Sequence, residues 1–489
     1  MSAPQGEARM LIDGELVDAS NGTTFDNVNP ATEDVLGVAA DATEDDLNRA
    51  VAAARRAFDT TEWSTDRDLR ARCLEQLKAA LEEVREELRP MIVAETGSPV
   101  ALTYVAQLDE PINSFGYWIE LAKTYKFDRD LGQVVSSGLP SRGVESREPI
   151  GVVGAITPFN FPLMLTLNKI GPALAAGCTI VHKAAPETPW SATVLGRLIV
   201  EKTDIPAGVV NILTSSRDEI GAALVAHPDV DMITFTGSTA TGRKILASAA
   251  ETVKRVHLEL GGKSAAIVLD DADLALATGF LASMACAHAG QACARHTRAL
   301  IPRSRYEEAT GILTALFRGL KCGDPTDAQF LHGPQVNAQQ RDLVLQQIDR
   351  AVSEGAKVAA GGGKPDYMDR GYWIEPTLLL DVDPDSLTAK EEIFGPVLAV
   401  IPYEDDDDAV RIANNSIYGL SGGVWSQDED RALSFARRIR AGTISINLSM
   451  FVHPSWPFGG YRQSGQGREG GVQGFEEFLE TKVISLPGG

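Results

Sequence analysis

Cysteine is scarce in this chain of 489 residues: there are five, an odd number, and none shows C-x-x-C spacing. Disulfide frameworks and zinc sites need several cysteines at short, regular spacings. The sequence therefore predicts neither, and it fits a reducing compartment, which we expect to be the cytoplasm. The seven histidines also lack the spacing of metal ligands, so no metal is expected.

Long apolar runs and an excess of basic residues are missing too. No stretch of about 18 apolar residues occurs, so no transmembrane helix is expected, and the polar start, Met1 to Arg9, lacks the apolar core of a signal peptide. Lys and Arg number 45 against 67 Asp and Glu, a formal net charge of −22. This balance argues against nucleic acid or an anionic membrane as a partner. It still permits an anionic cofactor held by local N–H groups and a few lysines.

Two stretches of alternating strand-like and helix-like segments divide a chain that is too long for one hydrophobic core. Apolar residues at helical spacing first predict two amphipathic helices, around 47–58 and 69–88. The alternations then run over 151–260 and 262–442. This pattern is typical of βαβ units around parallel sheets that bind ligands at the carboxyl ends of their strands. The expected fold class is therefore α/β, with two domains.

A predicted hairpin interrupts the first domain. Residues 131–150 form two short extended runs around a break at Gly138 and Pro140. An exposed hairpin leaves an open strand edge unless it pairs with another subunit. We therefore expect a homo-oligomer, either a homotetramer or a homodimer.

One cysteine, Cys293, stands among small residues at the end of the segment HAGQAC, residues 288–293. A thiolate is a strong nucleophile, and small neighbours leave room for a carbonyl carbon. A single cysteine in an apolar stretch is more often a buried hydrophobic residue, so this segment alone does not define a site.

Three other segments place polar groups where chemistry could use them. The segment FTGSTATG, residues 235–242, follows a strand and opens a helix, which suits a phosphate, but it has neither a P-loop ending nor G-x-G-x-x-G. Glu259 ends a strand before two glycines, a suitable place for a general base. Asn160, between Pro158 and Pro162, can direct an N–H at a developing oxyanion. Singly, each has an ordinary alternative: a Gly-Ser turn, an exposed loop acid and a turn asparagine.

Together, these motifs resemble those of the aldehyde dehydrogenase superfamily over nearly the whole chain. The matching positions are P-x-N-F-P at 158–162, Lys183, FTGST at 235–239, ELGGKS at 259–264, GQxC at 290–293, EEIFGP at 391–396, Asn447, and PFGG-x-x-x-SG-x-GRE at 457–469. The resemblance implies a Rossmann-like cofactor domain, a second α/β catalytic domain and a small β oligomerisation element. The implied boundaries are 1–130 and 150–260 for the NAD(P)-binding domain, 261–442 for the catalytic domain, 131–149 and 470–489 for the oligomerisation element, and 443–469 for a return to the cofactor and substrate-tunnel region.

The same resemblance implies that the chain oxidises a small aldehyde to a carboxylic acid with NAD, NADP being possible. Cys293 would attack the carbonyl to form a thiohemiacetal, whose oxyanion the Asn160 side chain and the Cys293 N–H would hold. Loss of hydride would leave a thioester. Glu259 would activate the water that releases the acid, with Lys169 near that base.

The resemblance also assigns the remaining site residues. Lys183 and Glu392 would hold the two riboses of the cofactor, Gly237 and Ser238 its pyrophosphate, and Phe394 would lie beside the nicotinamide. The full set of expected cofactor contacts is Ile156, Pro158, Phe159, Lys183, Pro186, Gly221, Phe235, Thr236, Gly237, Ser238, Leu260, Gly261, Glu392 and Phe394. The expected substrate tunnel is lined by Phe161, Asn168, Ala292 and Phe458.

Some positions depart from the pattern of the family. Pro186 stands where many NAD-dependent relatives have an acid, with Glu187 one step later, while Arg217 replaces a glycine near the adenine. Because no basic residue is added beside Lys183, NAD is favoured, although Arg217 would favour NADP. In the tunnel, Asn168 and Ala287 replace bulky aromatic residues, which predicts a wider or more polar passage.

Other functions are disfavoured by particular residues. A CoA-acylating semialdehyde dehydrogenase generally lacks the glutamate of ELGGKS, so Glu259 argues against it. A catalytically silent binding relative would not need Cys293, Glu259 and Asn160 together. A P-loop nucleotide hydrolase is disfavoured by the missing Lys-Ser/Thr ending after Gly242.

Overall fold

The structure is a computed structural model that describes residues 6–488. Its first sheet is built from strands that alternate with helices along the chain. Its eight strands are, in spatial order, β19 (Gly465–Gln466), β11 (Arg255–Glu259), β10 (Met232–Thr236), β7 (Val152–Ile156), β8 (Thr179–Lys183), β9 (Val210–Leu213), β1 (Met10–Ile12) and β2 (Glu15–Val17). The strands from β11 to β9 run parallel, and the others are antiparallel. β7 comes first of the parallel strands in the chain but lies between β10 and β8. The chain therefore winds outward from it in both directions, and the carboxyl ends of β7 and β10 form the switch point where such sheets bind ligands.

Helices cover both faces of this sheet, because strand residues that are adjacent in sequence point to opposite sides. Val153 packs in one hydrophobic cluster and Val152 in the other. The first face is covered mainly by α2 (Arg67–Glu83), α3 (Arg85–Thr96), α4 (Asp109–Ser114), α5 (Gly116–Thr124), α6 (Pro162–Ala176) and α7 (Trp190–Lys202). The second is covered by α1 (Glu44–Thr60), α8 (Asp218–Ala226) and α9 (Thr239–Ala249). A separate two-stranded sheet pairs β3 (Thr24–Val28) with β4 (Val35–Ala40).

The second sheet follows the same principle. Its strands are β14 (Lys357–Ala360), β15 (Thr377–Leu380), β16 (Val397–Tyr403), β13 (His296–Pro302), β12 (Ser264–Val268), β17 (Ser421–Trp425) and β18 (Thr443–Ile446). One face packs on α10 (Leu274–Cys286) and α11 (Tyr306–Gly319). The other packs on α12 (Ala338–Ser353), α13 (Leu387–Lys390), α14 (Asp406–Asn414) and α15 (Glu429–Ala436). β18 pairs with β17, so this sheet extends past the boundary expected at residue 442.

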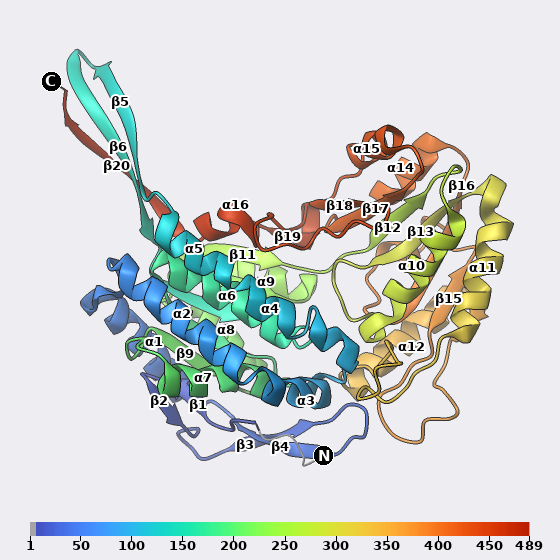
Figure 1. Ribbon diagram of the computed structural model, residues 1–489, viewed down its shortest axis with the longest axis horizontal. Coiled ribbons are helices and arrows are strands. Elements are labelled where there is room, and N and C mark those ends of the chain that lie inside the picture. The colour runs from blue at the N-terminus through green and yellow to red at the C-terminus, as the bar shows by residue number, and fades with distance from the viewer. Residues whose placement is uncertain (1–5, 489) are drawn as a thin grey trace.

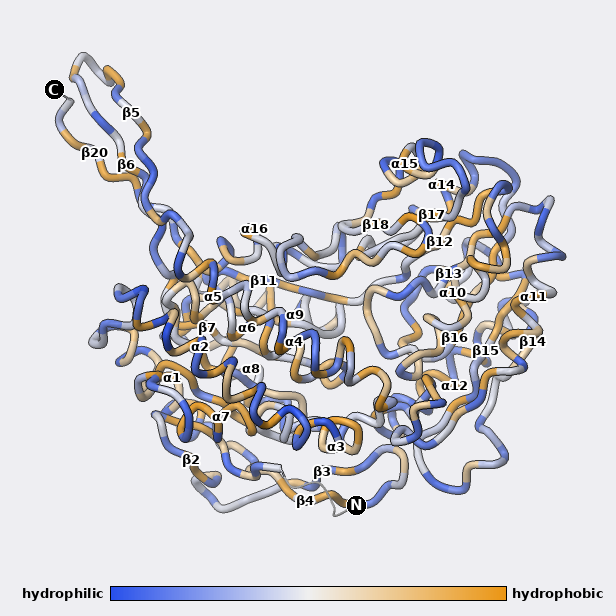
Figure 2. Tube along the Cα trace, in the orientation of Figure 1, coloured by the Kyte–Doolittle hydropathy of each residue, from blue (hydrophilic) through white to orange (hydrophobic). Residues whose placement is uncertain are grey.

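A three-stranded arm projects from the first body (Figure 1). It consists of β5 (Asp128–Ser136), β6 (Leu139–Pro149) and β20 (Leu479–Pro487), with β6 in the middle. The short helix α16 (Gly471–Glu476) precedes β20. Every residue of β5 is exposed, and Figure 2 shows apolar stretches along all three strands of the arm. The hairpin expected at 131–150 is therefore present, and the end of the chain adds a third strand to it.

The helix expected around 69–88 is two helices. Val84 ends α2 and precedes α3 with a ψ of 8°, outside the helical region. The apolar stripe continues across this break, because Leu81 and Leu88 are both buried in the same cluster. Hydrophobic spacing alone therefore does not reveal it.

Some expectations fall on the chain ends. The start Met1 to Arg9 includes residues 1–5, and the expected oligomerisation element includes 489, all outside the described part of the chain. Within residues 6–488, no helix is long and apolar enough to cross a membrane. Over the same range, His, Cys, Asp and Glu form no cluster that could hold a metal ion.

Candidate active site

The carboxyl ends of the first sheet bring several of the expected residues to one edge. β8 ends at Lys183, β10 at Thr236 and β11 at Glu259. Ile156, the last residue of β7, is in register with Lys183 on one side and Phe235 on the other, and Thr236 is in register with Glu259. Parallel pairing therefore sets the expected base and the expected cofactor residues along a single rim.

Cys293 lies on the second body, in the loop between η4 (Ala287–Gly290) and β13. His288 and Ala289 have φ values of 52° and 53°. Gly290 has φ 73°, and a Cβ there would lie 2.0 Å from the Gly395 carbonyl oxygen. Glycine at 290 is therefore required by the backbone that delivers the thiol.

Asn160 is held beside the cysteine loop. Its Nδ2 donates a hydrogen bond to the Gln291 carbonyl oxygen at 3.0 Å. The backbone carbonyl oxygen of Asn160 accepts hydrogen bonds from Gln107 Nε2 at 2.8 Å and from His288 Nε2 at 2.7 Å. Since an amide nitrogen carries two hydrogens, one remains for an oxyanion near Cys293.

The surroundings of Glu259 favour its protonated form. The residue is buried, and neither carboxylate oxygen has a hydrogen-bond partner within residues 6–488. Burial raises its pKa well above the ordinary value; the nearby Glu469 raises it further, while Lys169 and Arg468 lower it. A carboxyl group with a raised pKa is suited to general base catalysis near neutral pH.

Lys169, whose charge lowers the pKa of Glu259, is fixed by contacts with two other side chains. Its Nζ donates to Glu469 Oε1 at 2.9 Å and to Thr234 Oγ1 at 3.2 Å. Glu469 ends the GRE segment, whose match to the family gave this residue no role. The motif marks the residue, but its contact with Lys169 depends on the packing of segments 300 residues apart, so the sequence alone did not predict that contact.

Cys293 and Glu259 lie close enough for the charge of Glu259 to act on the Cys293 thiol. A Cβ on Gly262 would lie 2.7 Å from the Cys293 carbonyl oxygen, and one on Gly459 would lie 2.8 Å from Glu259 Oε1. Burial raises the pKa of the Cys293 thiol, and the charges of Glu259, Glu392 and Glu469 raise it further. The three expected chemical groups, at 160, 259 and 293, therefore lie in one region.

The start of α9 offers donors to a phosphate. Ser238 caps this helix by accepting a hydrogen bond from the Thr241 N–H at 3.1 Å. The cap satisfies one of the free N–H groups of the first turn and leaves the others for an anion. Gly237 lies just before the cap, where a Cβ would come within 2.4 Å of the Phe235 ring. This cradle fits the pyrophosphate of a dinucleotide.

Two side chains, the half-buried Glu392 and the buried Lys183, fit the riboses. Glu392 Oε1 accepts from the Gly262 N–H at 3.0 Å, and burial raises the pKa of Glu392 to about 7. A Cβ on Gly261 would lie 2.0 Å from Glu392 Oε2, so only glycine allows this approach. Burial lowers the pKa of Lys183, while Glu187, Asp218 and Asp41 oppose that shift.

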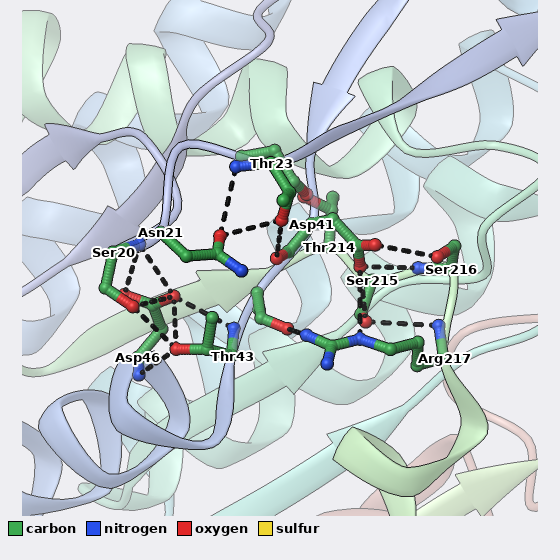
Figure 3. A network of polar contacts seen from close by, with 12 residues as sticks. Ser20, Asn21, Thr23, Asp41, Thr43, Asp46, Thr214, Ser215, Ser216 and Arg217 are labelled. Atoms are coloured by element: carbon green, nitrogen blue, oxygen red, sulfur yellow. Dashed lines mark hydrogen bonds and ion pairs between the residues drawn. The ribbon is translucent and has the colours of Figure 1, made fainter.

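Arg217, expected to favour NADP, is already bound by other groups of the protein. Its guanidinium donates to the Ala42 carbonyl oxygen, and its Nε lies 3.8 Å from Asp41 Oδ1 (Figure 3). Burial alone would raise the pKa of Asp41, but hydrogen bonds from Ser215 and Ser216 lower it, so Asp41 is anionic. The positive charge of Arg217 is thus partly neutralised.

Aromatic rings surround the cysteine loop. Phe159 and Phe394 meet edge to face at 6.0 Å between centroids, and Phe394 has φ 56°. Phe161 lies 5.3 Å from the His288 ring, and Phe458 stacks on Phe451 at 6.4 Å.

The other expected residues lie nearby in the chain or sheet: Pro158 before Phe159, Leu260 after Glu259, Ala292 before Cys293, and Gly221 on α8, where a Cβ would be 3.9 Å from Ile156 Cδ1. Asn168 and Pro186 are half-buried, and no hydrogen bond or ring contact in the described chain ties their side chains to these groups.

Comparison with known proteins agrees with this geometry. The family model described as "Aldehyde dehydrogenase family" matches residues 16–484. A relative named 3-succinoylsemialdehyde-pyridine dehydrogenase, from a Pseudomonas species, is 41% identical over 476 residues, which cover 97% of each chain. Putative aldehyde dehydrogenase DhaS from Bacillus subtilis is 38% identical, over 98% of this chain and 96% of its own.

Solved structures give the same result. An aldehyde dehydrogenase from Mycobacterium tuberculosis, complexed with NAD+, superimposes with a TM-score of 0.95 and 40% identity, and the match covers 99% of this chain and 98% of that one. A mutant of aldehyde dehydrogenase C from Pseudomonas syringae, complexed with NAD+ and octanal, has a TM-score of 0.92 and 39% identity, with 98% and 97% coverage. The likeness therefore includes both bodies and the arm.

Proposed function

The chain belongs to the aldehyde dehydrogenase family, and from this premise we propose that it oxidises an aldehyde to a carboxylic acid with NAD+. Cys293 is the nucleophile, Asn160 the oxyanion donor and Glu259 the general base. The observation that supports the proposal is the proximity of these groups: Asn160 Nδ2 lies 3.0 Å from the carbonyl oxygen of Gln291, two residues before Cys293, and the charge of Glu259 acts on the Cys293 thiol.

The first half of the reaction takes place at the sulfur. Once Cys293 has lost its proton, its sulfur attacks the aldehyde carbon, and the carbonyl oxygen becomes an oxyanion. The free hydrogen of Asn160 Nδ2 and the Cys293 N–H stabilise that charge where it develops. As the oxyanion collapses, hydride leaves the carbon and a thioester remains; when bound, NAD+ supplies the acceptor for this hydride.

The second half depends on Glu259. In its anionic form the carboxylate removes a proton from a water molecule that attacks the thioester carbon. The carbon–sulfur bond then breaks, the acid leaves, and the thiolate is restored. Lys169 and Glu469 set the charge near this base, because the two act on the pKa of Glu259 in opposite directions.

The residues of the first sheet would hold the cofactor. Ser238 and the first turn of α9 would bind the pyrophosphate, with Lys183 and Glu392 at the riboses. Asp41, Glu187 and Asp218 act on Lys183 as a negative group. Because these acids would repel a 2′-phosphate, NAD+ is preferred over NADP+.

Homo-oligomerisation through the arm and a cytoplasmic location complete the proposal. The arm exposes apolar side chains on all three of its strands, which suits burial against another copy. All five cysteines are free thiols, which suits a reducing compartment.

The test is an assay of the purified chain with a panel of aldehydes, using NAD+ and NADP+ in parallel. Reduced cofactor is followed by absorbance and the acid by mass spectrometry. Cys293→Ala should abolish oxidation and leave NAD+ binding nearly intact, whereas Cys73→Ala, at a buried position of α2, should retain turnover. A chain that forms no acid, or that forms acyl-CoA only when CoA is added, would refute the hydrolytic reaction.

A further inference from the structure

Arg295, two residues after the nucleophile, carries a positive charge that no acid neutralises within residues 6–488. Its Nε and Nη1 are buried and have no hydrogen-bond acceptor there. Burial lowers the pKa of the guanidinium to about 10; no carboxylate of the described chain opposes this shift, and Cys286 and Cys293 would oppose it only as thiolates. Arg295 remains charged at neutral pH. Like Cys293, it keeps part of its surface accessible to solvent.

The neighbouring side chains supply no compensating charge. Burial lowers the pKa of His288 to about 3 and also lowers that of His332, and Arg295 adds to both shifts, so both rings are neutral. Burial raises the pKa of the Cys286 thiol, although Arg295 opposes the change. The thiols are therefore protonated at neutral pH, and the guanidinium has no resident anion.

The loop that carries Arg295 is fixed on both sides. The carbonyl oxygen of Gln291 accepts a hydrogen bond from Asn160 Nδ2. The Gln291 side-chain Oε1 accepts another from the Val336 N–H at 2.9 Å. The Ala294 carbonyl oxygen accepts from Ser421 Oγ at 2.7 Å, and β13 begins at the next residue after Arg295. The backbone at Arg295 is therefore held in place beside the nucleophile.

We propose that Arg295 determines substrate specificity by binding an anionic group of the aldehyde, so that the preferred substrate carries a carboxylate a short distance from its carbonyl. This inference rests on the proposed function, since it names the substrate class of the same site. Arg295 binds the substrate and takes no part in the transfer of hydride or protons.

A carboxylate matches what the guanidinium lacks. Arginine presents its donors in a planar fork, and a carboxylate accepts two of them side by side while supplying the missing negative charge. A neutral aldehyde would leave a buried charge without a counter-charge, which is costly. The half-buried amide of Asn168, expected in the tunnel, is consistent with a polar substrate.

The experiment compares two short aldehyde acids, 4-oxobutanoate and 5-oxopentanoate, with their methyl esters, which remove only the charge. For each, kcat/KM is measured with the wild-type chain and with Arg295→Met, Arg295→Lys and a control, Arg303→Met, whose side chain is 60% exposed. We expect the wild type to prefer the acids. In Arg295→Met the ratio of acid to ester should fall on the order of 100-fold, mainly through KM. Arg295→Lys should give a smaller fall, and Arg303→Met the wild-type ratio.

A second readout does not need turnover: protection of Cys293 from iodoacetamide by succinate or glutarate. Protection that is lost in Arg295→Met supports the anion site even if no aldehyde is oxidised, an outcome that would refute the proposed function alone. The inference is overturned if the wild type treats acid and ester alike. It is also overturned if Arg295→Met lowers kcat/KM equally for acid and ester and slows the alkylation of Cys293, because the guanidinium would then act on the reactivity of the thiol.

Discussion

At the scale of single residues, the proposed mechanism depends on a carboxyl group that must lose its proton to act. Burial and Glu469 raise the pKa of Glu259. Deacylation should therefore accelerate with rising pH, as the fraction of anionic Glu259 increases. In Glu259→Gln this pH dependence should disappear and the acyl-enzyme should accumulate, visible as an added acyl mass on the protein. Ordinary steady-state turnover in this variant would contradict the assigned role.

The pair beside this base allows a sharper prediction. Lys169 lowers the pKa of Glu259 and Glu469 raises it. Lys169→Met should therefore shift the pH profile of deacylation to higher pH, and Glu469→Gln should shift it to lower pH. The measurement is the rate of acid release across a pH series after a single turnover. A purely structural role for the pair predicts lower rates in both variants with an unchanged profile.

Motifs revealed some of these residues and not others. Cys293 and Asn160 lie in short segments whose neighbours, such as Gly290, are constrained by the local backbone, so the sequence indicates them. The contact of Lys169 with Glu469 joins segments far apart in the chain. The lack of an acid beside Arg295 depends on every segment that packs around it. No local sequence pattern shows which charges are absent from a folded site.

At the scale of secondary structure, the three-stranded arm exposes apolar side chains that nothing in the described part of a single chain covers. Val135 on β5 and Val483 on β20 are 75% and 62% exposed. Replacing both with lysine should oppose burial against a second copy and lower the mass measured by light scattering toward the 52.3 kDa of one chain. Val253→Lys, at a site outside the arm that is 90% exposed, should keep the wild-type mass. A wild-type chain that already runs as a monomer would contradict the proposal.

Element boundaries were predicted less well than element types. Alternating apolar and turn segments indicated the parallel strands, because buried strands read as short apolar runs. The break at Val84 was missed, since the buried face continues through it. The third strand of the arm pairs with β6 in a register set by nine residue pairs from the far end of the chain, which no local signal could supply.

At the scale of the whole molecule, buried histidines predict sensitivity to acid. Burial lowers the pKa of His182 and His288 to about 3 and of His296 to about 4. In the unfolded chain these groups have a pKa near 6.5, so below that pH the unfolded state binds more protons than the folded state. The stability that these groups contribute is therefore full well above pH 6.5 and is lost as the pH falls toward 3. At pH 5 the loss is about 2 kcal/mol for each of His182 and His288.

This prediction is checked by thermal unfolding at pH 7 and pH 5, at one scan rate because large chains often unfold irreversibly. The wild-type Tm should fall markedly at pH 5. His182→Asn should show a smaller fall, because the replacement cannot be protonated. His453→Asn, at an exposed position, should behave as the wild type. An equal fall in all three proteins would show that other groups dominate.

Only the residues from Leu260 to Lys263 separate the strand that ends in the base from the strand that opens the second sheet. The carboxylate of Glu259 therefore lies on the first body and the sulfur of Cys293 on the second. In the proposed mechanism neither body alone holds both groups, so turnover requires the two bodies to stay in contact. Heat or denaturant that separated the two bodies would therefore stop turnover even if each sheet stayed folded, and activity would then report on the contact between them.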